Sequence, residues 1–280
     1  MKFSTFYHIY YKHRFLKANS FLKIYLFLIF PLSFINYKIN SEKKINLENL
    51  VISNSNLFKL SLNDLFEYFN SDKGSFYLNQ YTKSKKKERI QGHQYAFFYD
   101  KIFADIRNHE LNILELGSWK GGSAAAFSFF FKNSKIYSGD LYPDIFNFYS
   151  KRITNFKIDT SSEKSINKFI ENNNLKYNII IEDASHFLKD QIISLFLLFK
   201  TLKPKGMFVI EDLDFPDTRK DSNIFNEKPT LKEILTCIIN KQDFSSKYIN
   251  NFDKEYFLRN FDFIEIKKAR TNDIAFIKKK

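Results

Sequence analysis

The chain has 280 residues, and 44 Lys and Arg against 31 Asp and Glu give it a formal net charge of +13. Its 44% hydrophobic content, with 34 Phe and 16 Tyr, excludes a disordered chain, which would lack aromatic residues. The single cysteine, Cys237, excludes a secreted scaffold held by internal disulfides, so a reducing, cytosolic setting fits best.

The excess of positive charge has two explanations. Phe, Ile, Lys, Asn and Tyr share A/T-rich codons, and we favour codon bias that spreads solvated lysines over the surface. The alternative is a basic face for an anionic membrane or for nucleic acid. Basic clusters occur at residues 83–89 and 278–280, but neither lies in a known nucleic-acid-binding signature. We therefore expect no specific nucleic-acid partner.

Residues 1–56 form an N-terminal basic and apolar extension that ends in a linker. Four basic residues between positions 2 and 17 precede an apolar stretch at 21–35, which Lys23 and Pro31 interrupt. The stretch falls short of the ~20 apolar residues that span a bilayer, and no signal-peptide cleavage site follows it. Two alternatives remain: contact with a membrane surface through residues 1–36, or a helix packed on the domain. Residues 39–56, rich in Asn, Ser and Lys, are typical of a linker.

A second domain is expected over residues 57–280, with apolar spacing typical of helices at 57–69 and 90–107. Short apolar runs then alternate with helical segments near 121–132, 162–173 and 187–202, which predicts an α/β fold with a parallel sheet between helices. The strands are expected at 112–116, 135–139, 155–158, 177–181 and 207–210. Residues 261–267 and 273–277 predict a closing β-hairpin. A mostly parallel, seven-stranded sheet closed in this way is the Rossmann-like layout of class I methyltransferases.

Four of the seven glycines fall between residues 117 and 139, and glycine is needed where a backbone must approach something closely. Residues 113–123 read ILELGSWKGGS and lead from a predicted strand through a turn into a helix, where backbone N–H groups can meet a nucleotide-like ligand. Trp119 stands where a dinucleotide-binding loop needs its second glycine. The pattern instead resembles the S-adenosylmethionine loop of class I methyltransferases, which implies cofactor-binding roles for Glu115, Gly117, Ser118, Gly121 and Ser123.

Two acidic residues follow the next two predicted strands. Asp140 ends the sequence YSGD, and a carboxylate at this strand tip can accept both ribose hydroxyls in sheets of this kind. Its distance behind the glycine loop favours this role over a plain turn residue. Asp159 follows the third strand, where the family commonly binds the adenine edge. Helix capping by Ser161 or Ser162 is an equal alternative for that segment.

Two later strands end in acidic motifs: residues 177–186 read YNIIIEDASH and residues 206–213 read GMFVIEDL. Parallel strands bring their carboxyl ends to one sheet edge, so Asp183, Glu211 and Asp212 should converge beside the cofactor, with His186 nearby. Three carboxylates repel one another unless something neutralises them, and oxygen ligands suit Mg²⁺ or another hard cation. Taken singly, Asp183 would be interpreted as a surface turn residue and His186 as a histidine that caps the next helix. Their combination at two strand ends favours a site.

From SDKG at 71–74 and HQY at 93–95 through IEDL at 210–213, the chain resembles the metal-dependent sugar O-methyltransferases of the mycinamicin and macrocin type. That family has a strand ending in D-D-G-S-H and a later strand ending in I-E-D-L. The resemblance implies that the metal is bound by Asp183, Glu211 and Asp212, and that the base is His186. Glu182 and Ala184 depart from the family motif without removing an implied ligand.

The sequence therefore predicts an O-methyltransferase that uses S-adenosylmethionine and Mg²⁺ to methylate a sugar hydroxyl of a surface glycan or glycosylated metabolite. Two alternatives are a lipid or small phenolic acceptor, and a non-catalytic membrane-associated scaffold. A D/N-P-P-Y/F tetrapeptide, typical of many nucleic-acid methyltransferases, is missing. We expect a cytoplasmic protein that is peripheral at the inner face of the membrane, and leave open whether it forms a homo-oligomer.

Overall fold

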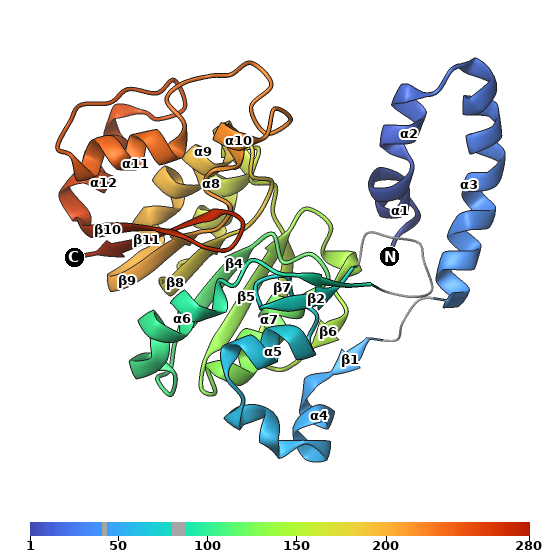
Figure 1. Cartoon of the computed structure of the whole chain (residues 1–280), viewed down its shortest axis with the longest axis horizontal. Helices are drawn as coiled ribbons and strands as arrows, with labels where there is room; N and C mark the ends of the chain where they lie inside the picture. The colour runs from blue at the N-terminus through green and yellow to red at the C-terminus, as the bar shows by residue number, and fades with distance from the viewer. Residues whose placement is uncertain (41–43, 80–87) are drawn as a thin grey trace.

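The computed structural model describes residues 1–40, 44–79 and 88–280. Its main body is a seven-stranded sheet with the strand order β10-β11-β9-β8-β4-β5-β7 (Figure 1). The parallel strands are β4 (Asn112–Leu116), β5 (Lys135–Asp140), β7 (Ile153–Lys157), β8 (Tyr177–Glu182) and β9 (Leu202–Ile210). Strand β11 (Asp273–Lys279) runs antiparallel to β9 and to β10 (Phe261–Lys268). The predicted sheet and its closing hairpin are confirmed.

Helices cover both faces of the sheet and enclose two cores. Strand β8 contributes Ile179 and Ile181 to the first core and Ile180 to the second, because successive side chains of a strand point to opposite faces. The first core contains side chains of α5 (Leu62–Tyr68), α6 (Ala96–Phe103) and α7 (Gly122–Phe130). The second contains side chains of α8 (Glu163–Asn172), α9 (Leu188–Leu198), α11 (Leu231–Ile239) and α12 (Asn251–Asn260).

Smaller elements complete the body of the protein. An antiparallel ribbon joins β2 (Phe76–Leu78) to β3 (Arg89–Gln91), so the helix expected from residue 90 begins only at Ala96. The short helix α10 (Phe215–Thr218) follows β9. The 3₁₀-helices are η1 (Ser55–Lys59), η2 (Ala104–Ile106), η3 (Pro143–Ile145) and η4 (Phe199–Thr201).

The linker expected at residues 39–56 is wrong for much of its length. Strand β1 (Ile45–Asn46) pairs in parallel with β6 (Phe148–Tyr149), and α4 (Leu47–Ser53) follows directly. The side chain of Asn46 accepts hydrogen bonds from the first turn of α4, and Leu47 is buried in the first core. An N-cap and one anchoring leucine are therefore enough to order this polar segment.

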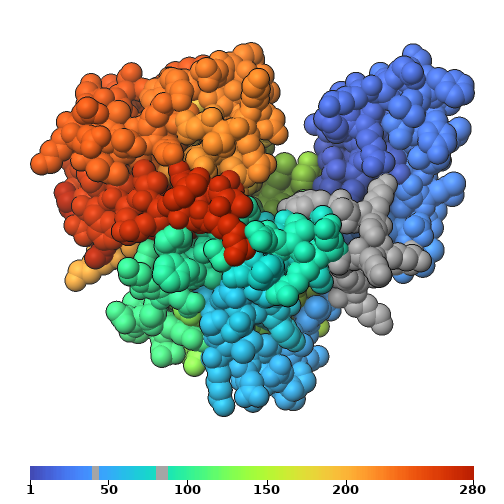
Figure 2. Space-filling view, in the orientation of Figure 1, coloured from blue at the N-terminus to red at the C-terminus, as the bar shows by residue number. Residues whose placement is uncertain are grey.

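Residues 1–40 form a helical hairpin, in which α1 (Phe3–Tyr10) and α2 (Lys12–Lys17) pack against α3 (Ser20–Asn40). The hairpin has its own small core, made of Phe6, Tyr11, Ala18, Leu26 and Phe30. It projects as a separate lobe beside the sheet domain (Figure 2). One alternative for this segment was a helix packed on the domain. The buried face of α3 instead packs against α1 and α2, so that alternative is wrong for α3.

Helix α3 is longer than the apolar stretch in the sequence suggested. Its residues 20–39 have a mean hydropathy of 1.5, and the helix is long and apolar enough to cross a membrane by length and composition. The expectation that this segment falls short of a membrane span is therefore wrong. Pro31 lies inside the helix without ending it.

The start of the hairpin and strand β1 contact the same short stretch of the domain. The backbone N–H of Lys2 and the hydroxyl of Thr5 donate hydrogen bonds to the carboxylate of Asp144. In β1, Ile45 donates its N–H to the carbonyl of Asn147, at 2.8 Å, where β1 pairs with β6. Residues 144–149 therefore contact both segments.

The two basic clusters of the sequence have different outcomes. Of the cluster at residues 83–89, positions 83–87 lie outside the described residues. In the cluster at 278–280, the Lys279 side chain is buried, and its Nζ donates to the carbonyl of Leu202 and to the hydroxyl of Tyr256. Lys279 is therefore part of the domain interior and does not belong to a basic surface.

Candidate functional site

A cavity of about 810 Å³ opens at the carboxyl ends of the central parallel strands. Its lining contains predicted residues from the glycine loop, from the tip of β5 and from the ends of β8 and β9: Gly117, Ser118, Ser123, Asp140, Asp183, His186 and Asp212. Glu115, Gly121, Asp159 and Glu211 are outside the lining. Motifs that are separated by up to a hundred residues in sequence thus meet at one sheet edge, as the parallel topology predicts.

The glycine loop between β4 and α7 depends on two glycines with a φ of +85°, Gly117 and Gly121. A Cβ on Gly117 would lie 1.9 Å from the backbone oxygen of Asp183, and a Cβ on Gly121 would lie 2.4 Å from the ring of Phe146. Only glycine allows this backbone conformation at such close approach. The loop is therefore a backbone surface packed against the turn after β8, and the N–H groups of Gly117 and Ser118 donate to the carbonyl of Gly139.

Asp140 fixes this loop. One carboxylate oxygen accepts the N–H of Trp119 at 2.8 Å, and the other accepts the N–H of Tyr142 at 2.7 Å. Burial raises the pKa of Asp140, while these two hydrogen bonds oppose the shift. Each carboxylate oxygen keeps a second lone pair, so Asp140 can still accept a hydrogen bond from a ligand in the cavity.

Two other predicted cofactor residues, Ser118 and Asp159, have structural roles of their own. Ser118 is buried, and its hydroxyl accepts a hydrogen bond from Ser138 at 2.7 Å. Asp159 accepts the N–H and the hydroxyl of Ser161, in a turn before α8. The capping alternative for that segment also holds, because Ser162 accepts the N–H of Ser165 and caps α8.

Glu115 is fully buried in β4 beneath the loop. Neither of its carboxylate oxygens has a hydrogen-bond partner among the described residues. Burial raises the pKa of Glu115 to about 7, although the nearby ammonium of Lys73 opposes the shift. Ser123, which lines the cavity, also opposes this shift, so Glu115 lies behind a residue of the cavity wall.

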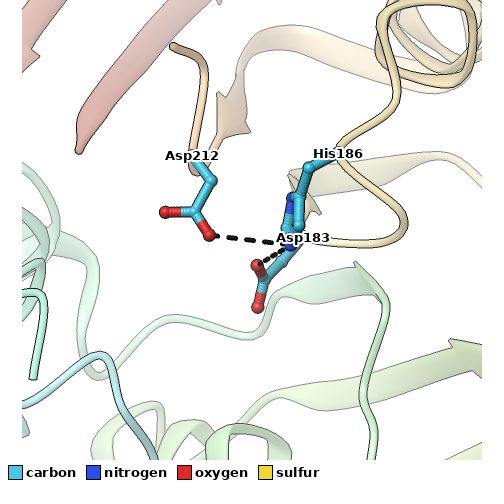
Figure 3. A group of neighbouring side chains, drawn as sticks. All are labelled: Asp183, His186 and Asp212. Atoms are coloured by element: carbon cyan, nitrogen blue, oxygen red, sulfur yellow. Dashed lines mark ion pairs between the residues drawn. The ribbon is translucent and has the colours of Figure 1, made fainter. Parts of the chain in front are cut away.

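Asp183, His186 and Asp212 form the centre of the site (Figure 3). One ligand atom from each lies within 4.8 Å of the others. His186 Nε2 lies 3.7 Å from a carboxylate oxygen of Asp183 and 3.6 Å from Oδ2 of Asp212. The remaining Asp212 oxygen accepts hydrogen bonds from Tyr95 and Asn272, both at 2.6 Å. These two bonds orient the Asp212 carboxylate so that Oδ2 faces the histidine.

Glu211 lies behind this group and is held by other partners. Its Oε1 accepts the hydroxyl of Tyr99 at 2.5 Å, and its Oε2 accepts the ammonium of Lys73 at 2.5 Å. The same ammonium forms an ion pair with Asp183. The structure therefore brings Asp183, Asp212 and His186 together, whereas Glu211 is linked to Asp183 through Lys73.

The electrostatics of the centre differ between its two aspartates. Burial raises the pKa of Asp183 to about 7, although the ammonium of Lys73 opposes the shift. Burial alone would raise the pKa of Asp212. The nearby His186 and His93, and the hydrogen bonds from Tyr95 and Asn272, hold this pKa below the ordinary value. Burial lowers the pKa of His186. At neutral pH the Asp212 carboxylate is therefore charged, and the imidazole of His186 is neutral and able to accept a proton.

Sequence reasoning missed several residues of the centre. Lys73 stands in the SDKG motif at 71–74 without an expected role. Tyr95 of the HQY motif was expected, with His93, to line the substrate entrance, and His93 does line the cavity. Tyr99 lies in the apolar pattern of α6, where an aromatic residue reads as core. Asn272 comes from the turn between β10 and β11, and no local pattern in the sequence points from that turn to the site.

The donor set fits a hard divalent cation. The carboxylates of Asp183 and Asp212 converge beside the cavity, and Glu211 is linked to Asp183 through Lys73. Carboxylate oxygens are ligands that suit Mg²⁺ or Mn²⁺. Cys237, a potential soft ligand, lies on α11 away from this edge. The close backbone approach at Gly117 and the acceptor at Asp140 likewise fit a nucleoside-bearing cofactor.

No protein-family model matches the chain. It is 30% identical over 128 residues to demethylmacrocin O-methyltransferase of Streptomyces fradiae, and 29% identical over 128 residues to mycinamicin VI 2''-O-methyltransferase of Micromonospora griseorubida. Each alignment covers 43% of this chain and 32% of the relative. The chain thus matches about a third of the length of these curated relatives.

Solved structures show the same fold. The mycinamycin-pathway methyltransferase MycE, in complex with Mg and SAH, matches with a TM-score of 0.59 at 21% identity, covering 79% of this chain and 55% of that chain. Its complex with Mg, SAH and mycinamycin VI matches with a TM-score of 0.59 at 22% identity, covering 79% and 53%. The chain therefore has the Rossmann-like class I methyltransferase fold and resembles the macrolide-sugar O-methyltransferases in sequence.

Proposed function

We propose that the protein is an S-adenosylmethionine-dependent and Mg²⁺-dependent O-methyltransferase that acts on a sugar hydroxyl. The observation that carries this proposal is the convergence of Asp183, His186 and Asp212 on the cavity that the Gly117 loop and Asp140 also line. The names of the relatives support it, since they are O-methyltransferases for sugar-bearing macrolides, and MycE was solved with Mg and SAH.

The cofactor end of the cavity is formed by the glycine loop. Gly117, Ser118 and Ser123 line the cavity where the polar end of S-adenosylmethionine would lie, and Glu115 beneath the loop would accept from its ammonium group. Asp140 would accept the ribose hydroxyls, as carboxylates at this strand tip do in related sheets. Gly121 and Ser123 begin the helix beside the cofactor, and Asp159 would face the adenine edge.

Asp183 and Asp212, with Glu211 as the third expected ligand, would hold the cation. A divalent cation bound there makes a nearby sugar hydroxyl more acidic. His186 Nε2, neutral because burial lowers the pKa of its imidazole, takes the hydroxyl proton. Tyr95 and Asn272 hold the carboxylate of Asp212 in position. Methyl transfer is an in-line displacement, and alignment of the acceptor with the methyl group supplies much of the rate.

The acceptor that we favour is a sugar of a surface glycan or of a glycosylated metabolite. A lipid or small phenolic acceptor would use the same residues and is the alternative. A scaffold without activity is disfavoured, since erosion of the glycine loop or of the acidic residues would be expected, and these are present.

Cation-dependent methyl transfer tests the proposal. The purified protein would be incubated with methyl-labelled S-adenosylmethionine and a panel of glycosides, lipids and phenols, with and without excess chelator. We expect transfer to glycosides, its loss in chelator and its recovery with MgCl₂, while cofactor affinity changes little. Undiminished transfer in chelator would refute the metal mechanism, and transfer to phenols alone would refute the acceptor class.

We also propose that the hairpin of residues 1–40 binds the inner face of the membrane and keeps the cytoplasmic enzyme peripheral there. Residues 1–40 contain six Lys and Arg but no Asp or Glu. The outer face of α3 is apolar and uncovered: Leu28 is 65% exposed and Leu32 is 68% exposed. An apolar face on a purely basic lobe fits an anionic lipid surface.

Vesicle flotation tests the membrane proposal. The full chain should float with phosphatidylglycerol-containing vesicles, and Leu28→Glu with Leu32→Glu should reduce the bound fraction about tenfold. Phe252→Glu is the matched control, because Phe252 is 72% exposed on α12 and should not affect binding. Equal flotation of wild type and the α3 variant would refute the proposal, as would self-association through α3 without lipid binding.

A further inference from the structure

Lys73 is a buried cation at the centre of the acidic site. Its side chain is only 2% exposed, and its Nζ contacts Oδ2 of Asp183 and, at 2.5 Å, Oε2 of Glu211. In the part of the chain that the structure describes, no other Lys or Arg pairs with either carboxylate. The ammonium therefore occupies the position between these two acids where a positive charge is most needed.

The loop that carries Lys73 is held firmly. The carbonyl of Lys73 accepts the N–H of Ala96 at 3.1 Å, and the carbonyl of Asp72 accepts the N–H of His93 at 2.7 Å. Gly92 closes the same contact, since a Cβ there would lie 2.2 Å from the carbonyl oxygen of Gly74. These backbone contacts fix the position of the loop from which the Lys73 side chain reaches Asp183 and Glu211.

Lys73 and its two acidic partners are shielded from solvent together. The side chain of Asp183 is 18% exposed and that of Glu211 is 1% exposed. Glu211 is buried and would be left without a cationic partner if the ammonium were removed. A buried charge that loses its partner strongly destabilises a fold.

We propose that Lys73 is a built-in counter-cation, which neutralises Asp183 and Glu211 in the metal-free protein and competes with the divalent cation for the same carboxylates. The inference rests on the proposed function, because the cation belongs to it. Lys73 is then a positioning residue with two effects. It keeps the acids paired before the cation arrives, and it weakens cation binding by its own charge.

Lys73→Met tests both effects, because Met preserves much of the side-chain length without the charge. In chelator, the variant should unfold at a lower temperature than wild type, and MgCl₂ should raise its melting temperature more than it raises that of wild type. By calorimetry, Mg²⁺ and Mn²⁺ should bind the variant at least about tenfold more tightly, since a positive charge has been removed from contact with two expected ligands.

The matched control is Lys279→Met. Lys279 is also buried, but its Nζ donates to a backbone carbonyl and a tyrosine hydroxyl far from the cavity. This variant should lose stability equally in chelator and in MgCl₂, and its cation affinity should equal that of wild type. If MgCl₂ restores the stability of Lys73→Met but not that of Lys279→Met, Lys73 acts through its charge and not only through packing.

The double variant Lys73→Met with Glu211→Gln covers the case in which the single variant does not fold. Removing the unpaired carboxylate should restore folding in chelator, and failure of both variants to fold would overturn the proposal. Unchanged or weaker cation affinity in Lys73→Met would also overturn it and leave the proposed function standing. If neither wild type nor Lys73→Met binds a divalent cation, the inference and the metal mechanism both fail.

Discussion

His186 combines an unusual backbone with a constrained ring. Its φ is +57°, a left-handed conformation that is uncommon outside glycine, although asparagine, aspartate and histidine adopt it more often than other residues. The ring packs edge-on against Phe215 at a centroid distance of 4.8 Å, while Nε2 faces Asp183 and Asp212. Strained conformations of this kind cluster at functional sites, where the surrounding structure maintains them.

His186→Asn is expected to lower turnover by about 10²–10⁴-fold, the usual contribution of a positioned general base. Asparagine tolerates the left-handed backbone, so the fold should be retained. Turnover at saturating cofactor would be measured together with the melting temperature and the cofactor dissociation constant. Turnover within twofold of wild type would exclude His186 as the base, and a large fall in melting temperature would point to a structural role.

Glu115 predicts a pH-dependent effect on stability. Its pKa is raised from 4.5 to about 7 in the folded protein, mainly by burial. The unfolded chain releases this proton more readily, so Glu115 costs stability as the pH rises from 4.5 through 7, and costs nothing below 4.5. Glu115→Gln should therefore raise the free energy of unfolding by up to about 3 kcal/mol at pH 8.5, since one pKa unit corresponds to about 1.4 kcal/mol.

Denaturant titrations of wild type and Glu115→Gln at pH 4.5 and pH 8.5, without cofactor, would measure this effect. Glu110→Gln is the control, because Glu110 is exposed two positions before β4. An equal difference at both pH values would show that Glu115 acts through packing and not through its charge.

At the scale of elements, the glycine loop is the link between β4 and the turn after β8. Gly117→Ala combines a φ of +85° with a Cβ placed 1.9 Å from the backbone of Asp183, so one of the two segments must move. We expect a loss of at least about 2 kcal/mol of stability, together with weaker cofactor binding, because strain of this kind costs of order 1–3 kcal/mol per residue.

Calorimetry of cofactor binding and thermal unfolding would check the Gly117→Ala prediction. Gly74→Ala provides the comparison, since its Cβ would come no closer than 3.2 Å to a neighbour. Wild-type cofactor affinity in Gly117→Ala would show that the loop is not part of the cofactor site.

The elements that sequence reasoning found are those with strong local patterns. The strand expected at residues 112–116 is β4 to the residue, because an apolar run ends there in a glycine turn. Helix α11 was missed although Thr230 and Glu233 form a capping box, a signal that the sequence contains. The ion pair from Lys73 to Glu211 joins residues 138 positions apart. Only the assembled topology places them together, so no local pattern could predict it.

At the scale of the whole molecule, the hairpin and the sheet domain have separate cores. Removal of residues 1–40 should therefore leave the sheet domain folded, with a melting temperature within a few degrees of wild type and full turnover of a soluble glycoside. Circular dichroism and methyl-transfer assays on the shortened chain would measure this. Loss of the cooperative transition would show that the hairpin is part of the domain's fold.

The hydrogen bonds of Lys2 and Thr5 to Asp144 hold the start of the hairpin against the sheet domain, four residues after Asp140 in the cavity lining. Contacts of this kind restrict how far the lobe can tilt relative to the cavity. A lobe embedded in lipid would then hold the cavity mouth at one height above the bilayer. Acceptors would be selected by reach, since only a hydroxyl carried at that height from its lipid anchor could enter.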